Sequence, residues 1–205
     1  MAPRPDVSEE RKSQIVEAAL VVFTRHGING ARMEDIAREA GLSKGTLYWY
    51  FDSKESLVFS MLEYLFGEYF QSVITDIPKV EGTVAERLTF LAEELVRYSQ
   101  EMADLWPVSY EIYAWALRED SVREQVKQYF DASRDILSEL IRQGIERGEF
   151  RPVDPEETAL QIVAFNEGLQ QLQALYGEDV DWRGLMLGSV NLIVSALKSE
   201  ERETF

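Results

Sequence analysis

Apolar residues recur along the whole chain at the spacings of three and four positions that place them on one face of a helix. No segment sustains the alternation of apolar and polar residues that is typical of a strand. The pattern therefore predicts an all-α fold. We expect nine helices, at residues 7–26, 33–40, 44–50, 53–75, 84–104, 107–118, 121–147, 155–176 and 181–198.

Helix-capping signals support most of these boundaries. At five predicted helix starts, a side chain that can accept a hydrogen bond from a free backbone N–H stands three positions before an acidic residue. The pairs are Asp6/Glu9, Asp52/Glu55, Thr83/Glu86, Ser121/Glu124 and Asp154/Glu157. Glycine readily takes the left-handed conformation of a helix C-cap, and it stands at four predicted helix ends, at positions 27, 41, 148 and 177.

Residues 33–52 carry the pattern with the clearest chemistry. Two short predicted helices meet at Gly41, which permits a sharp turn, and the small side chain of Ala37 permits close helix contact. This is the spacing of a helix-turn-helix, whose second helix enters the major groove of DNA by its N-terminal end. That end offers free N–H groups and a positive partial charge. The residues expected nearest the DNA are Ser43, Lys44, Gly45 and Thr46.

Three consecutive aromatic residues, Tyr48, Trp49 and Tyr50, follow in the same predicted helix. Because each helical residue advances by about 100°, one compact core face does not hold all three rings. We expect at least one of them to be exposed or to face a partner. The alternative is an ordinary pair of short helices with core aromatics.

The distribution of charge is compatible with a DNA partner for the first region alone. The net charge of the whole chain is −16, which argues against a polyanionic partner. However, residues 1–57 contain 8 basic and 9 acidic residues, whereas residues 58–205 contain 13 basic and 28 acidic residues. The two regions are therefore predicted to differ in role.

The segment 27–57, GINGARMEDIAREAGLSKGTLYWYFDSKESL, resembles the DNA-binding region of the TetR family of bacterial transcriptional regulators. The resemblance implies a DNA-binding domain at 1–52 and an all-α domain at 53–205 that binds a small-molecule effector and forms a homodimer. It also implies a repressor that binds a palindromic double-stranded DNA operator. By matching positions, the implied operator-facing residues are Lys44, Gly45, Thr46, Tyr48, Trp49 and Tyr50, with Lys54 as a phosphate contact.

One departure from the family pattern lies just before the helix predicted at 33–40. Many members have two threonines there, whereas this chain has Ala31 and Arg32. The change removes a hydroxyl cap from the helix N-terminus. Arg32 is in turn a candidate contact to a DNA phosphate.

The two last predicted helices carry very little charge. Glu167 is the one charged residue within 158–177, and residues 184–197 have none. Such helices must be covered on more than one side. We expect helices 155–176 and 181–198 to pair with their counterparts in a homodimer, with Gly168 and Gly188 permitting close approach. The alternative is that both helices lie at the centre of a monomeric core.

Aromatic residues are concentrated at 98–115, and Glu111 is the one charge within 107–117. A carboxylate among aromatic rings suits a lipophilic cation, so we expect a largely hydrophobic effector, neutral or cationic. The alternatives are an acyl-coenzyme A bound by local basic residues, and a Glu111 that is merely exposed opposite core aromatics. The candidate effector-binding residues are Tyr98, Trp106, Tyr110, Glu111, Tyr113, Trp115 and Phe165.

Composition excludes several other classes of site. The chain has no cysteine and a single histidine, His26, so thiolate metal sites, disulfides and histidine clusters are not possible. P-loop, dinucleotide-binding, GxSxG and HExxH motifs are also absent from the sequence. We therefore expect no catalytic residue, metal or cofactor, which leaves a ligand-binding or scaffolding bundle as the alternative to a regulator.

The hydrophobic stretches do not predict contact with a membrane. The longest one without charge, at 185–197, is shorter than the roughly 20 residues of a membrane span. The first residues also lack the apolar core of a signal peptide. We expect a cytoplasmic protein.

Overall fold

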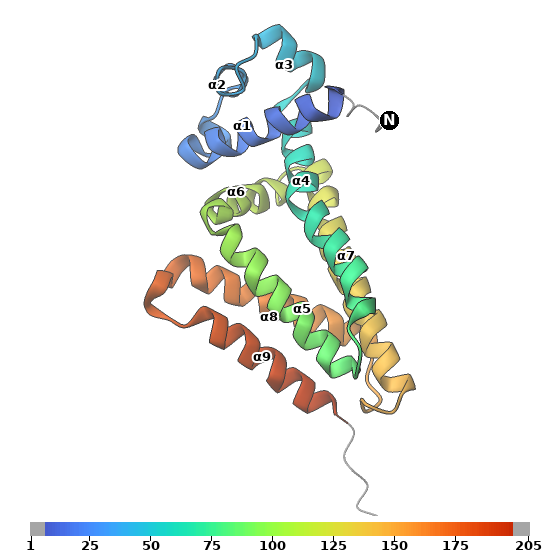
Figure 1. Ribbon diagram of the computed structural model, residues 1–205. Coiled ribbons are helices and arrows are strands. Elements are labelled where there is room, and N and C mark those ends of the chain that lie inside the picture. Colours follow the sequence, from blue (N-terminus) through green and yellow to red (C-terminus); the bar gives the residue numbers. More distant parts are fainter. Residues whose placement is uncertain (1–6, 199–205) are drawn as a thin grey trace, which may run out of the picture. The chain divides into compact units, whose positions relative to one another are not determined.

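The chain is seen as a computed structural model in Figure 1, which describes residues 7–198 apart from the side chains at 7, 65, 66, 68–72, 74 and 178. Within that range all regular elements are helical, which confirms the all-α prediction. The α-helices are α1 (Val7–Gly30), α2 (Met33–Glu39), α3 (Lys44–Tyr50), α4 (Lys54–Asp76), α5 (Val84–Glu101), α6 (Trp106–Ala116), α7 (Asp120–Glu146), α8 (Pro155–Tyr176) and α9 (Trp182–Leu197). Short 3₁₀ turns lie at Ile77–Lys79, Ala103–Leu105 and Gly177–Asp179.

Two of the five predicted caps are confirmed by hydrogen bonds. Thr83 and Glu86 form a reciprocal capping box at the start of α5. Asp154 accepts hydrogen bonds from the N–H groups of Glu156 and Glu157 at the start of α8. Asp6 lies outside the described residues.

Two predicted caps are wrong. The N–H of Ser56 donates to the hydroxyl of Ser53 at 3.0 Å, so Ser53 rather than Asp52 caps α4. Helix α7 begins at Asp120, so Ser121 lies in its first turn and its hydroxyl donates to Glu55 instead. At α4, the serine next to the predicted cap is better placed for the free N–H groups than the aspartate chosen from spacing.

All four glycines predicted at helix ends have positive φ, between 65° and 72°. The end of α1 differs from the prediction, because helical structure resumes for one turn after Gly27, which has φ 68° and ψ 164°. Helix α5 also ends earlier than predicted, and a separate 3₁₀ turn follows it.

Contacts divide the chain into two compact units. The first unit extends up to Tyr69 and includes Ala103–Val126, and the second comprises Phe70–Met102 and the chain from Lys127 onward. The division differs from the predicted boundary at 52/53, because α6 packs on α1. It is a division by contacts and not by role, so the two functional domains remain a prediction.

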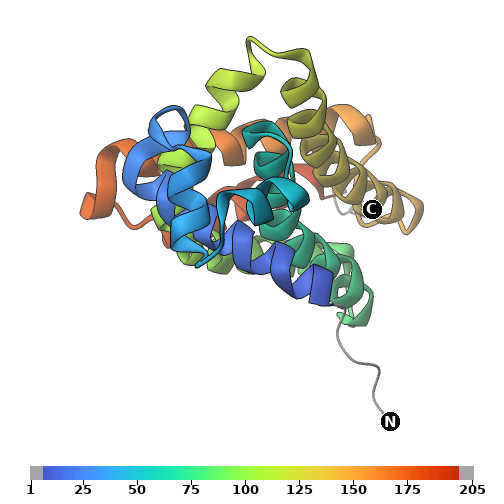
Figure 2. The same cartoon turned by 90° about the horizontal axis from the view of Figure 1, so that it is seen from above.

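In the first unit, α1 contacts both α2 and α6, and α2 contacts α3. Figures 1 and 2 show α1, α2 and α3 gathered in one group. The core of the unit consists of side chains that are almost completely buried on each of these helices. They include Ile15 and Phe23 of α1, Ile36 of α2, Leu47 of α3 and Ile112 of α6.

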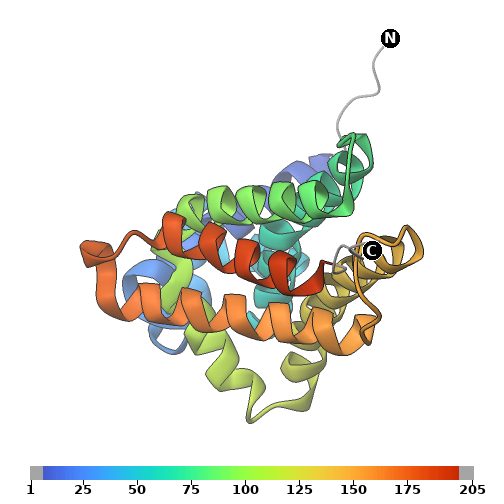
Figure 3. The ribbon, with the colours of Figure 1, turned by 90° about the horizontal axis from the view of Figure 1, so that it is seen from below.

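In the second unit, α9 contacts both α5 and α8. Figures 1 and 3 show that α5 and α8 run in the same direction and α9 in the opposite one. Val96 of α5, Leu169 of α8 and Met186 of α9 meet in a buried cluster. A hydrophobic centre of this kind holds the three helices together.

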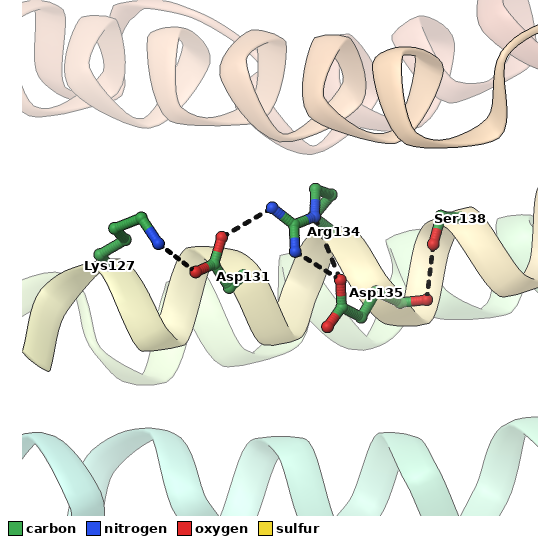
Figure 4. Close-up of polar contacts among 5 residues, drawn as sticks. All are labelled: Lys127, Asp131, Arg134, Asp135 and Ser138. Carbon is green, nitrogen blue, oxygen red and sulfur yellow. Dashed lines mark hydrogen bonds and ion pairs between the residues drawn. The ribbon is translucent and has the colours of Figure 1, made fainter. Parts of the chain in front are cut away.

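Helix α7 carries a row of ion pairs along its surface (Figure 4). The ammonium of Lys127 lies 2.7 Å from the carboxylate of Asp131, which also accepts from Arg134 at 2.8 Å. The hydrogen bond from Lys127 lowers the pKa of Asp131. Ion pairs one turn apart on one helix stabilise that helix only slightly, so this row adds little to the stability of α7.

We predict opposite effects on stability for alanine at two helical glycines. A methyl group at Gly144 would overlap the buried ring of Phe150, whereas one at Gly67 would meet nothing within 4 Å. Gly144→Ala is expected to lower the free energy of unfolding by about 1–3 kcal/mol through overpacking. Gly67→Ala should raise it by about 0.4–1 kcal/mol, because alanine restricts the unfolded chain. Thermal denaturation measures both, and equal melting temperatures for the two variants would contradict the packing described here.

Candidate DNA-binding interface

The turn between α2 and α3 is built from backbone bonds around Gly41. With φ at 65°, Gly41 reverses the chain, and the N–H of Leu42 donates to the carbonyl of Ala37 at 2.8 Å. The side-chain amide of Gln14, on α1, donates to the carbonyl of Ala40 at 2.7 Å. The turn is thereby attached to the first helix, as a helix-turn-helix requires.

The N-terminal end of α3 is capped by its own hydroxyl groups. Ser43 has extended backbone angles and accepts the N–H of Thr46 at 3.0 Å, and the two hydroxyls lie 2.8 Å apart. Ser43, Lys44, Gly45 and Thr46 are all exposed. The first N–H groups of any helix lack an acceptor within that helix, so this exposed end suits a phosphate or a base edge.

Lys44 is held by an acidic residue of the neighbouring helix. Its ammonium pairs with the carboxylate of Glu34, on α2, and lies 5.7 Å from the centre of the Tyr48 ring. The hydrogen bond between them lowers the pKa of Glu34 and raises that of Lys44. The pair therefore persists to lower pH than an ordinary carboxylate would allow. Sequence reasoning missed Glu34, because its distance from Lys44 depends on the angle between the two helices.

The three aromatic residues of α3 point in different directions, as expected. Leu47 faces the core, whereas the exposed fractions of Tyr48 and Trp49 are 42% and 74%. Tyr50 is half-buried, and its ring packs edge-on against that of Trp49, with 4.6 Å between the ring centres. The expectation that at least one aromatic side chain is exposed is confirmed, and contact of these rings with DNA stays a prediction.

Arg32 and Lys54 occupy very different surroundings. Arg32 is exposed at the N-cap of α2 and makes no capping hydrogen bond, as expected for a chain that lacks threonine there. Lys54 is half-buried, and its ammonium donates to the carbonyls of Ile28 at 2.6 Å and Ala31 at 3.1 Å. An ammonium has three protons, so one remains for a phosphate. The DNA contacts of both residues stay predictions.

The predicted effector-binding residues are divided between the two units. Five of them, Trp106, Tyr110, Glu111, Tyr113 and Trp115, lie on α6 in the first unit and are half-buried. Tyr98 and Phe165 belong to the second unit. Burial raises the pKa of Tyr98 well above its ordinary value, and the side chain of Phe165 is 50% exposed. Effector binding by this set stays a prediction.

Glu111 has backbone partners in the first unit. Its carboxylate accepts the N–H of Ile28 at 2.7 Å and the N–H of Asn29 at 3.4 Å. It is therefore neither fully exposed nor unpaired. This arrangement weakens the argument that the carboxylate awaits a cationic effector.

Three buried polar atoms have no hydrogen-bond partner among the described residues, and sequence reasoning singled out only one of the three residues, Trp106, and missed Ser99 and Gln173. These atoms are the hydroxyl oxygen of Ser99, the indole nitrogen of Trp106 and the side-chain amide oxygen of Gln173. A buried polar atom without a partner destabilises a protein, so each one is a candidate contact for a ligand. A serine or glutamine in a helix gives no such signal until its neighbours are known.

Large exposed hydrophobic side chains are concentrated on α8, α9 and the loop between them. Eight of the thirteen among the described residues lie there, and this set is called the α8–α9 apolar face below. Its members are Leu160, Phe165, Leu172, Leu175, Tyr176, Val180, Leu185 and Leu192. Exposed apolar side chains that gather on neighbouring helices make this face a candidate interaction site.

Neither a metal site nor a membrane span is found in the described part of the chain. Its histidine and acidic residues form no group of three that would hold a metal ion. None of its helices is long and apolar enough to cross a membrane.

Comparison with known sequences identifies both halves of the chain. Residues 15–61 match the family described as "Bacterial regulatory proteins, tetR family", and residues 84–185 match "BetI-type transcriptional repressor, C-terminal". The HTH-type transcriptional regulator YfiR of Bacillus subtilis is 30% identical over 198 residues, which cover 95% of each chain.

Solved structures of other regulators share the fold, and two of them contain a ligand. A transcriptional regulator from Saccharomonospora viridis in complex with choline has a TM-score of 0.78 at 24% identity and covers 91% of this chain and 96% of that one. The regulator FadR from Bacillus subtilis in complex with stearoyl-CoA has a TM-score of 0.73 at 23% identity and covers 90% and 98%.

We predict that the ion pair between Glu34 and Lys44 tunes DNA binding. Lys44→Ala should weaken binding to DNA from upstream of the gene and reduce the slope of log affinity against log salt by about one. Glu34→Gln should strengthen binding, because it releases the ammonium and removes a negative charge. Titrations at several salt concentrations measure both effects. Lys79→Ala is the control, since Lys79 is also exposed and paired, with Asp76, outside this interface. Equal affinity for all three variants would contradict the assignment.

Proposed function

Because this chain belongs to the TetR family of bacterial transcriptional regulators, we propose that it is a repressor that binds a palindromic operator as a homodimer. A small, largely hydrophobic effector releases it from the DNA. The observation that carries the proposal is the exposed N-terminal end of α3, where Lys44, Tyr48 and Trp49 point outward from a helix anchored by Leu47.

The size of α3 supports a dimer. One helix of seven residues presents only a few side chains to the major groove, which is too little surface to specify a site alone. A homodimer brings two such helices to two half-sites related by two-fold symmetry.

The α8–α9 apolar face supports the same proposal. Its leucine and aromatic side chains would be covered by the same helices of a second copy. Gly168 and Gly188 are exposed on these helices, and a methyl group at either would meet nothing within 4 Å in the single chain. Two helices of different copies can therefore approach closely at these positions.

We predict that charge on this face separates the dimer. Leu175→Glu and Leu192→Glu change side chains that are 74% and 73% exposed, so the fold should persist while the dimer dissociates. Leu117→Glu is the matched control, because Leu117 is 80% exposed but lies outside the face. Analytical ultracentrifugation measures the mass, and footprinting measures protection of the operator.

The wild type and the control should be dimers that protect two matching half-sites. The two interface variants should be folded monomers that protect neither half-site. A variant that remains dimeric would contradict the interface, and protection of a single asymmetric site by a monomer would contradict the proposed mode of binding.

Three observations bear on the chemistry of the effector. Residues 58–205 contain 13 basic and 28 acidic residues, and this excess of negative charge disfavours binding of a simple polyanion. Ser99 and Gln173 have buried polar atoms that the described residues leave without a partner. The two similar structures contain choline and stearoyl-CoA, a small cation and an acyl thioester, so both classes belong in a search for the effector of this chain.

Release from DNA follows from differential binding. The protein has a form that binds DNA and a form that does not. An effector shifts the population toward the second form only as far as its affinity for that form exceeds its affinity for the first. The effector must therefore make contacts in one form that the other lacks.

We predict that Ser99 contributes to the effector site. A ligand at a hundredfold excess over its dissociation constant should stabilise the protein by about 2.7 kcal/mol, which thermal shift detects readily. The screen compares quaternary ammonium compounds, neutral aromatic compounds and acyl-coenzyme A thioesters. Ser99→Ala should raise the melting temperature without ligand, since it removes an unsatisfied hydroxyl, and should reduce the shift produced by the ligand.

Ser189→Ala is the matched control for this screen. Ser189 is also buried on a helix, but its hydroxyl already donates to the carbonyl of Leu185 at 2.7 Å. Stabilisation by none of the three classes would contradict the proposed effector chemistry. Equal ligand shifts for the two alanine variants would contradict the role of Ser99.

A further inference from the structure

Two side chains of opposite charge hold the junction between α1 and α2. A carboxylate accepts hydrogen bonds from its backbone N–H groups, and an ammonium donates to its backbone carbonyls. Gly27 leaves the helical conformation, with φ 68° and ψ 164°. Helical structure then resumes for one turn before α2 begins. In that turn, the N–H groups of Ile28 and Asn29 bind the carboxylate of Glu111. The carbonyls of Ile28 and Ala31 bind the ammonium of Lys54.

The contact with Glu111 lies directly against position 27. A Cβ at Gly27 would lie 2.5 Å from Oε1 of Glu111, so any larger residue there would displace the carboxylate. Glycine is favoured by the positive φ, and it also leaves the carboxylate in its place. This links a helix of the DNA-binding region to a residue more than 80 positions further along the chain.

Glu111 is also tied to the core of its own helix. The next residue, Ile112, is almost completely buried, and α6 contacts α1. The carboxylate is half-buried, and hydrogen bonds in which the acceptor is charged are stronger than neutral ones. A displacement of α6 is therefore expected to pull or release the N–H groups of Ile28 and Asn29.

We propose that Glu111 is a positioning residue that couples α6 to the helix-turn-helix, through the turn at 27–31. Arg32, the N-cap of α2, follows this turn directly, so the turn sets where α2 begins. Helix α6 follows α5, which belongs to the second unit, after a single 3₁₀ turn. A movement of α5 that an effector causes would therefore reach Glu111 through α6. This inference rests on the proposed function, in which an effector releases the protein from DNA. It gives Glu111 a role in transmitting that release and not in binding the effector.

Hydrogen exchange of the backbone amides tests this coupling in the full-length protein. Glu111→Ala should increase the exchange rates of Ile28 and Asn29 about tenfold or more, as expected for the loss of bonds to a charged group. The amides of α2 should exchange faster as well, whereas those of α8 should not change. Glu111→Gln retains an acceptor oxygen and should restore part of the protection. Glu124→Gln, an exposed residue of α7, is the control and should behave as the wild type.

Binding to DNA from upstream of the gene provides the second measurement. Operator affinity is compared with and without choline or stearoyl-CoA, whichever stabilises the wild type. Glu111→Ala should reduce the effect of the probe on operator affinity about fivefold or more, within the range of coupling between two sites, while the thermal shift with the probe persists.

Unchanged exchange at Ile28 and Asn29 would overturn the coupling, and so would faster exchange there with no change in α2. A normal response of Glu111→Ala to the probe would overturn it too. A wild-type protein that binds no upstream DNA would contradict the proposed function instead. In that case exchange in α2 decides alone whether Glu111 positions the helix-turn-helix.

Discussion

Short helices need bonds at their ends, and this constraint governs the whole DNA-binding region. Helices α2 and α3 have seven residues each, fewer than an isolated helix needs to be stable in water. Each also buries few side chains. Their positions therefore depend on bonds to their termini from longer helices, with Gln14 holding the turn between them and Glu111 and Lys54 holding the turn before α2. We expect loss of any of these bonds to loosen the ends of α2 or α3, while the buried side chains of the core keep their contacts.

The negative charge of the chain, −16 in total, is concentrated outside the first region, since residues 1–57 carry 8 basic and 9 acidic residues. Much of the positive charge is paired with carboxylates within one helical turn, as on α5 and α7. At α3, the pair between Lys44 and Glu34 joins two helices and lies where a phosphate would compete for the ammonium. We propose that Glu34 holds this lysine in place in the free protein and that a DNA phosphate replaces it in the complex.

Residues 58–205 combine two features that lower the stability of an isolated chain. The α8–α9 apolar face exposes leucine and aromatic side chains, and the atoms of Ser99 and Gln173 are buried without a partner among the described residues. Apolar surface is stabilised by a second protein surface, whereas an unsatisfied hydroxyl or amide oxygen needs a hydrogen-bonding group. The two features therefore require different partners. For this reason we propose both a second copy of the chain and a ligand.

The sequence by itself determined the helices, the helix-turn-helix and the family. These features depend on residues close together in the sequence, such as the capping box at Thr83, the turn at Gly41 and the run from Ser43 to Leu57. Only the tertiary structure decided the partners of Glu111, Lys54 and Lys44, because each partner lies at least ten positions away. Local periodicity assigns a side chain to a face of its helix. Which backbone group meets that face depends on how the helices cross, and so Glu111, expected among the effector contacts, lies on the backbone of Ile28 and Asn29.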